Sequence, residues 1–147
     1  MQLGGSDVGL MREAARLAVK YGYRHININC GCPSPKVAGA GNFGASLMRE
    51  AALVRELSHA VSEVTGEPTT VKCRIGVDDE DSYEFISAFI EKVSGSSSSS
   101  ASTSPSEVNH FIVHARKALL GGKFSPADNR KIPPLKYVIA RGLHYYL

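Results

Sequence analysis

Amide and cationic side chains recur at the ends of three apolar stretches of this chain. They are Asn27, Asn29, Lys72, Arg74, His114 and Arg116. Such groups donate hydrogen bonds to the oxygens of anions and nucleotides, and charge strengthens these bonds. In proteins built from βα repeats, the carboxyl ends of neighbouring strands meet on one face. We therefore predict a shared site for an anionic or nucleotide ligand.

Two of these residues have a purely structural alternative. Lys72 lies between Val71 and Cys73 in a stretch that we expect to be buried, where an unpaired lysine is costly. It either forms a salt bridge to a carboxylate such as Asp78 or stabilises negative charge on a bound cofactor. His114 titrates near neutral pH, and it either contacts a cofactor edge or is a hydrogen-bonded core histidine.

The cysteines favour a reducing, intracellular compartment. Their number is three, which leaves one unpaired, so we expect no disulfide framework. Cys30 and Cys32 have no second cluster with the spacing that a zinc site needs, and we expect no metal. Whether the compartment is the cytoplasm or an organelle stays open.

Two further segments have candidate binding roles. Residues 39–44 are rich in glycine but lack the dinucleotide-binding spacing directly after a strand, so they form either a loop near a ligand or a plain surface loop. Arg116, Lys117 and Arg130 belong to a basic series after the third apolar stretch. This series is either a solvated face or a set of phosphate contacts.

The elements that position these groups alternate between helix and strand. Helical spacing of apolar residues predicts helices that begin at Ser6 or Asp7, over 47–64, after Asp79 or Asp81, and near 135–141. Alternating and β-branched residues predict strands over 24–29, 69–75 and 110–114. This order implies a parallel sheet with right-handed crossovers, an α/β fold. Residues 95–106 are mostly serine and predict a flexible loop.

Composition and charge set limits on the partners. The 147 residues are 43% hydrophobic and 21% charged, as in ordinary globular domains. A net charge of +3 tolerates a polyanionic partner without demanding one. The chain has no apolar run long enough for a membrane span and no visible signal peptide, so we expect no membrane association. The oligomeric state stays open.

Several segments, in the same order, resemble the tRNA-dihydrouridine synthases. They are Gln2-Leu-Gly-Gly-Ser-Asp7, Ile26-Asn-Ile-Asn-Cys-Gly-Cys-Pro-Ser34, Phe43-Gly-Ala-Ser-Leu-Met48, Val71-Lys-Cys-Arg-Ile-Gly-Val-Asp78, Asp81-Ser-Tyr83, Phe111-Ile-Val-His-Ala-Arg-Lys117 and Asn129-Arg-Lys-Ile-Pro-Pro-Leu135. The last two resemble the branch that acts on positions 20 and 20a of the tRNA D-loop.

This resemblance implies an FMN-binding (β/α)8 barrel with a helical domain that helps hold tRNA. Reduced FMN would pass a hydride to C6 of a flipped-out uracil, a cysteine would protonate C5, and NADPH would reduce the flavin. The matching positions imply flavin contacts for Gln2, Lys72 and His114, and contacts near the uracil for Asn29 and Arg74. The RNA-facing candidates are Arg116, Lys117 and Arg130.

The resemblance places the acid in the loop after the first predicted strand. Ser46 stands where the family usually has cysteine, and Asn42 stands where some members have one instead. Neither side chain is an acid comparable to a thiol of pKa about 8.5, so we expect slow turnover of tRNA. In a completed barrel we expect Ser46→Cys to restore activity, and Asn42→Cys to do so if the displaced position supplies the donor. We interpret Cys32 as part of the Gly-Cys-Pro turn, and we expect poor geometry for Cys30.

By this resemblance residues 1–147 form part of an FMN-dependent TIM-barrel catalytic domain, with roughly strands 3 to 6 of the barrel and their helices. The loops after strands 7 and 8, which hold the cofactor phosphate in such barrels, would lie outside it. Three interpretations stay open. The chain is a truncated synthase, a catalytically dead tRNA-binding relic, or part of another flavin-dependent TIM-barrel oxidoreductase.

Overall fold

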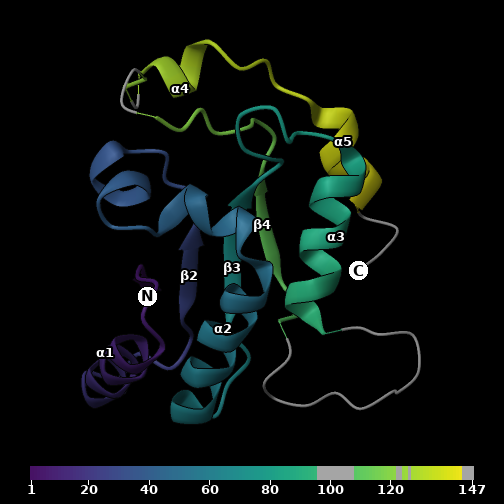
Figure 1. The fold of residues 1–147 in the computed structure, drawn as a ribbon. Helices are drawn as coiled ribbons and strands as arrows, with labels where there is room; N and C mark the ends of the chain where they lie inside the picture. Colours follow the sequence, from purple (N-terminus) through teal and green to yellow (C-terminus); the bar gives the residue numbers. More distant parts are fainter. Residues whose placement is uncertain (96–107, 122–123, 126, 144–147) are drawn as a thin grey trace.

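A parallel four-stranded sheet forms the centre of the protein (Figure 1). The computed structural model describes residues 1–95, 108–121, 124–125 and 127–143. The strands follow the chain order β1-β2-β3-β4, and each neighbouring pair is parallel. Their bounds are Gln2–Leu3 for β1, Asn27–Cys30 for β2, Thr70–Arg74 for β3 and Phe111–His114 for β4. The predicted parallel α/β fold is confirmed.

Three long helices occupy the crossovers between these strands: α1 (Val8–Lys20), α2 (Ala51–Thr65) and α3 (Tyr83–Ser94). Four short helices lie beyond the carboxyl ends of the strands or follow β4: η1 (Pro35–Gly39), η2 (Gly44–Arg49), α4 (Asp128–Lys131) and α5 (Tyr137–Gly142). In Figure 1, α1 and α2 lie side by side, and α3 lies beside β4.

The two faces of the sheet differ sharply. Ile28, Cys30 and Val71 are fully buried among the apolar side chains of the long helices and form the core with them. Since successive strand residues point to opposite faces, Asn29 and Lys72 point the other way. They stand opposite each other in the register, as do Arg74 and His114 one level further along. The sheet therefore presents a polar face that no helix among the described residues covers.

The sequence patterns predict the type of most elements but misplace several ends. The predicted helix 47–64 is interrupted at Glu50, whose backbone is not helical, so η2 and α2 are separate. The strand predicted from residue 24 begins only at Asn27. Ser82, rather than Asp79 or Asp81, caps α3 by accepting the backbone N–H of Phe85.

Asp7 caps α1 as predicted, but only part of the predicted apolar face of this helix is buried. Met11 and Ala15 enter the core, whereas Leu10 and Leu17 are 72% and 56% exposed. Except for Gly95, the left-handed residue that ends α3, the predicted loop 95–106 lies outside the described residues. Among the helices that are described, none is long and apolar enough to cross a membrane.

Candidate functional site

A hollow of about 170 Å³ opens at the carboxyl ends of the strands, and we call it the strand-end hollow. It is lined by Gln2, Asn29, Gly31, Cys32, Pro33, Lys72, Cys73, Arg74 and His114. The structure thus brings together all the residues that we assigned to the flavin and the uracil. They come from all four strands and from the turn that follows β2.

A row of amide side chains crosses the polar face of the sheet. Asn29 Nδ2 donates to Gln2 Oε1 at 3.3 Å, and Gln2 Nε2 donates to Asn27 Oδ1 at 2.6 Å. Asn27 Nδ2 in turn donates to Thr70 Oγ1 at 2.9 Å. Each amide thereby fixes the orientation of the next across β1, β2 and β3. The row explains why polar residues alternate with buried isoleucines in the strand that contains Asn27 and Asn29.

The Gly31–Cys32 turn is held by side chains of two strands. Asn29 Oδ1 accepts the backbone N–H groups of Gly31 and Cys32 at 3.0 and 3.1 Å. Arg74 Nε donates to the carbonyl oxygen of Gly31 at 2.7 Å. The turn is therefore anchored to β2 and to β3, directly above the strand-end hollow.

Lys72 is exposed, and the prediction that it is buried is wrong. Because Lys72 alternates with the buried Val71 and Cys73, its side chain stands on the polar face rather than in the helical layer. The suggested partner Asp78 binds Arg49 instead, at 3.1 Å. No carboxylate among the described residues pairs with Lys72, so its charge is available to a ligand.

His114 is surrounded by cations. Partial burial lowers its pKa from the ordinary value, and the charges of Arg74, Arg116 and Lys72 lower it further. The imidazole is therefore neutral near pH 7 and offers one donor and one acceptor nitrogen. Since the lining contains no acidic residue, the strand-end hollow has a positive potential.

The three cysteines have very different surroundings. Cys30 and Cys73 are fully buried, and burial raises the pKa of Cys73 to about 12 and that of Cys30 well above its usual range. Cys73 borders the strand-end hollow, but its side chain is not accessible. Cys32 is half-buried and is among the lining residues, so it is the one of the three cysteines that is not fully buried. Our interpretation of Cys32 as a turn residue alone missed this.

Neither predicted position for the acid lines the strand-end hollow. Ser46 lies in η2, and its hydroxyl donates to the carbonyl oxygen of Phe43 at 2.9 Å. Asn42 is exposed, with a left-handed backbone at φ 49°. The sequence does contain one signal for Cys32. It follows Asn29 by three residues, and an asparagine side chain can accept the backbone N–H of a residue that closely follows it.

Most of the basic residues that we singled out after β4 already have partners within the protein. Arg116 donates to the carbonyl oxygen of Pro133. Lys117 Nζ lies 3.4 Å from Asp81, which also binds Lys136 at 2.6 Å, and these contacts hold the pKa of Asp81 below its usual range. Arg130 is exposed on α4 and, within the described residues, forms no ion pair. None of the three lines the strand-end hollow.

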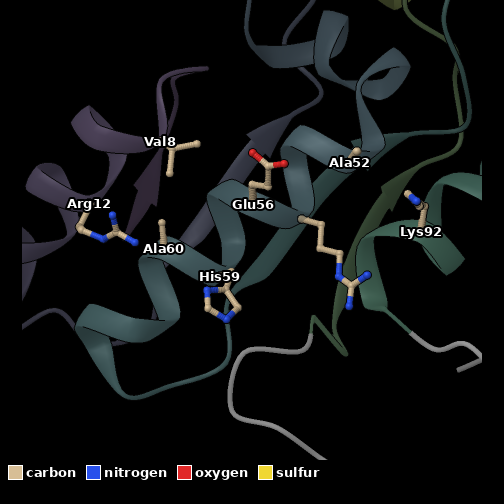
Figure 2. A pocket seen from close by; sticks show the side chains of 8 residues that line it. Val8, Arg12, Ala52, Glu56, His59, Ala60 and Lys92 are labelled. Atoms are coloured by element: carbon tan, nitrogen blue, oxygen red, sulfur yellow. The ribbon is translucent and has the colours of Figure 1, made fainter. Parts of the chain in front are cut away.

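A second depression of about 590 Å³ lies on the outer surface of the long helices (Figure 2). It is lined by Val8, Arg12, Ala52, Arg55, Glu56, His59, Ala60 and Lys92. Figure 2 shows the charged ends spread along it rather than gathered at one point. Arg12 already pairs with Glu63 at 2.6 Å, and His59 lies 3.5 Å from the same residue. The charged side chains of this depression therefore do not converge on one point, unlike the polar side chains of the strand-end hollow.

Across the residues that the structure describes, no group of three or more histidine, cysteine, aspartate or glutamate side chains could hold a metal ion. The candidate site instead consists of hydrogen-bond donors, two cations and a thiol. The protein is thus of the parallel βα class, with its candidate site at the carboxyl ends of the strands, where such folds build their active sites.

Comparison with known proteins identifies the family within this class. The sequence model described as "Dihydrouridine synthase (Dus)" matches residues 1–141. The chain therefore belongs to the dihydrouridine synthase family, which is a family of oxidoreductases.

Bacterial relatives named "tRNA-dihydrouridine(20/20a) synthase" support this assignment. Those of Xylella fastidiosa strain 9a5c and Escherichia coli strain K12 are each 50% identical to this chain over 137 residues. That of Xanthomonas campestris pv. campestris is 48% identical over the same length. Each alignment covers 93% of this chain but only 37%, 36% and 37% of the respective relative. The chain thus spans little more than a third of their length.

Proposed function

We propose that this chain forms part of the catalytic domain of a tRNA-dihydrouridine synthase, which reduces a D-loop uridine to 5,6-dihydrouridine with FMN as carrier and NADPH as reductant. Its four strands would be the third to sixth of an eight-stranded barrel. The observation that carries the proposal is the convergence of Gln2, Lys72 and His114 with Cys32 on one hollow.

The residues present fit a flavin. When bound, FMN supplies hydride chemistry and takes up negative charge on its pyrimidine edge as it is reduced. The exposed ammonium group of Lys72 has no carboxylate partner among the described residues, and it can stabilise that charge. The neutral imidazole of His114 and the amide of Gln2 would hold the ring carbonyls. The absence of acidic groups from the lining suits an anionic ligand.

We propose Cys32, ahead of Ser46 and Asn42, as the proton donor to C5 of the uracil. Cys32 is half-buried and is among the residues that line the hollow, which supports this role. In this role Sγ of Cys32 would give its proton to C5, and the thiolate left behind would take a proton back from solvent. Ser46 would then act only in the loop, where its hydroxyl already binds Phe43.

The chain spans only 37% of the length of a relative, so the test uses a full-length synthase that contains this segment. The measurement is the dihydrouridine content of tRNA that lacks this modification, after incubation with that protein, FMN and NADPH. Mass spectrometry should find dihydrouridine in the D-loop. Binding of tRNA without any dihydrouridine would favour the tRNA-binding relic. Flavin reduction without tRNA binding would favour another flavin-dependent oxidoreductase. Because tRNA is the substrate, we propose an intracellular location.

Lys72→Ala should weaken FMN binding about tenfold or more, because the variant loses a charge-assisted hydrogen bond to the ring. Quenching of flavin fluorescence during titration measures this affinity. The matched control is Lys92→Ala, since Lys92 lies in the depression on the outer helical surface. An equal loss of affinity in both variants would contradict a specific contact.

Arg130→Ala should lower the slope of log affinity for tRNA against log salt concentration by about one, because one phosphate contact is lost. Arg116→Ala and Lys117→Ala should change it less, since both side chains already have protein partners. Filter binding at several salt concentrations measures the slope. Arg12→Ala, on the outer helical surface, is the control and should leave the slope unchanged.

A further inference from the structure

Arg74 is the one charged side chain that is fully buried among the described residues, with 6% of its surface exposed. A buried charge is costly unless other groups compensate it. No aspartate or glutamate in the described ranges forms an ion pair with it. Burial lowers its pKa most, the neighbouring Cys32 opposes this, and Arg116 lowers the pKa further, although a guanidinium stays charged at any physiological pH. Its compensation must come from hydrogen bonds.

Those hydrogen bonds go to main-chain carbonyl oxygens in two different loops. Nε donates to Gly31 at 2.7 Å, in the turn after β2, and Nη1 donates to Lys117 at 3.1 Å, after β4. A guanidinium is planar, so the directions of its donors are fixed relative to each other. One side chain on β3 thereby sets the spacing between the loops that follow both neighbouring strands.

The contact to Gly31 has a specific consequence for Cys32. The carbonyl of Gly31 and the N–H of Cys32 belong to the same peptide unit. Arg74 holds the carbonyl end of this unit, and Asn29 Oδ1 holds its N–H end at 3.1 Å. With both ends fixed, the plane of the peptide and the position of the Cα atom of Cys32 are determined.

We propose that Arg74 is a positioning residue that fixes the Gly31–Cys32 peptide and so sets where Cys32 stands at the rim of the hollow. It does this in place of the contact near the uracil that the resemblance implies. The proposal rests on the proposed role of Cys32 as proton donor. Arg74 then affects catalysis by fixing the geometry of the turn, and not by raising the affinity of the protein for the uracil base.

The decisive variant is Arg74→Lys, which keeps the charge and loses the planar fork. Backbone hydrogen exchange in peptides covering residues 30–34 should become about tenfold faster or more, because a charge-assisted bond to the turn is lost. Arg12→Lys, on the outer helical surface, is the matched control and should leave this exchange unchanged. Unchanged exchange in Arg74→Lys would overturn the proposal. If that variant does not fold, Arg74→Gln, which buries no charge, gives the same test.

A kinetic readout separates positioning from substrate contact. In tRNA reduction by the flavin-loaded protein, Arg74→Lys should lower kcat at least tenfold, while KM for tRNA and the rate of flavin reduction by NADPH stay within twofold. A raised KM with an unchanged kcat would mean that Arg74 contacts the substrate, and the proposal would be wrong. Hydrogen exchange requires no turnover, so it decides the role of Arg74 in the turn even if the proposed activity is absent.

Discussion

Replacement of Cys32 by alanine is expected to lower dihydrouridine formation about 100- to 10,000-fold, the range that general acid catalysis contributes. Cys32 lines the strand-end hollow, and the other two thiols are buried with raised pKa values. Without the thiol, the uracil that has accepted a hydride lacks a nearby proton for C5. The measurement is dihydrouridine in tRNA by mass spectrometry after a single turnover. Flavin reduction by NADPH should stay within twofold.

Variants of the loop residues supply the control for this prediction. Ser46→Ala should change the rate less than threefold, because the Ser46 hydroxyl binds the backbone of Phe43 and does not line the hollow. The competing hypothesis expects Ser46→Cys or Asn42→Cys to accelerate the reaction strongly. If either does so while Cys32→Ala has no effect, Cys32 is not the donor.

Gly76→Ala is expected to destabilise the fold by about 3 kcal/mol, a large effect for one added methyl group. A Cβ at this position would lie 2.0 Å from the carbonyl oxygen of Glu80 and 2.7 Å from Cα of Asp81. Both are backbone atoms of the tight turn after β3, so no flexible side chain can move away. The turn must shift, and the bond from Ala118 N–H to the Gly76 carbonyl, now 2.9 Å, must weaken with it.

Urea denaturation followed by circular dichroism measures this change in the free energy of unfolding. Gly39→Ala is the matched control, because Gly39 is exposed in η1 and a Cβ there meets nothing within 4 Å. Its stability should stay within 0.5 kcal/mol of the wild type, the usual range for surface substitutions. Equal losses in both variants would show that the contact with Glu80 is relieved at little cost.

The sequence predicts the fold class well because helix and strand periods differ clearly here. Ile26 and Ile28 alternate with asparagines, and the apolar residues of α2 recur at helical spacing. The ends of elements depend on interactions that no short pattern contains. Glu50 interrupts the predicted helix at the junction of η2 and α2, and α4, which the sequence analysis did not predict, contains the buried Asn129. The Asn129 side chain binds both the N–H and the carbonyl of Leu119.

The site residues could be predicted as a group, because parallel strands bring their carboxyl ends together. Their individual surroundings could not. The prediction that Lys72 is buried was wrong, because a β-branched, apolar stretch does not reveal that only one face of the sheet is covered by helices. Lys117 forms an ion pair with Asp81, which lies 36 positions earlier in the chain. Local sequence patterns do not indicate a contact over such a separation.

The acid-free lining of the strand-end hollow also links the folding equilibrium to the ligand. Lys72 and Arg74 both line the hollow, and their charges oppose protonation of the neighbouring His114. An anionic occupant acts as their counter-ion and stabilises the native state relative to the unfolded chain, by an amount that grows with its concentration. If the hollow takes the proposed anionic cofactor, the fraction of chains that are folded would rise with the concentration of that cofactor. Binding would thus regulate the abundance of the protein as well as its chemistry.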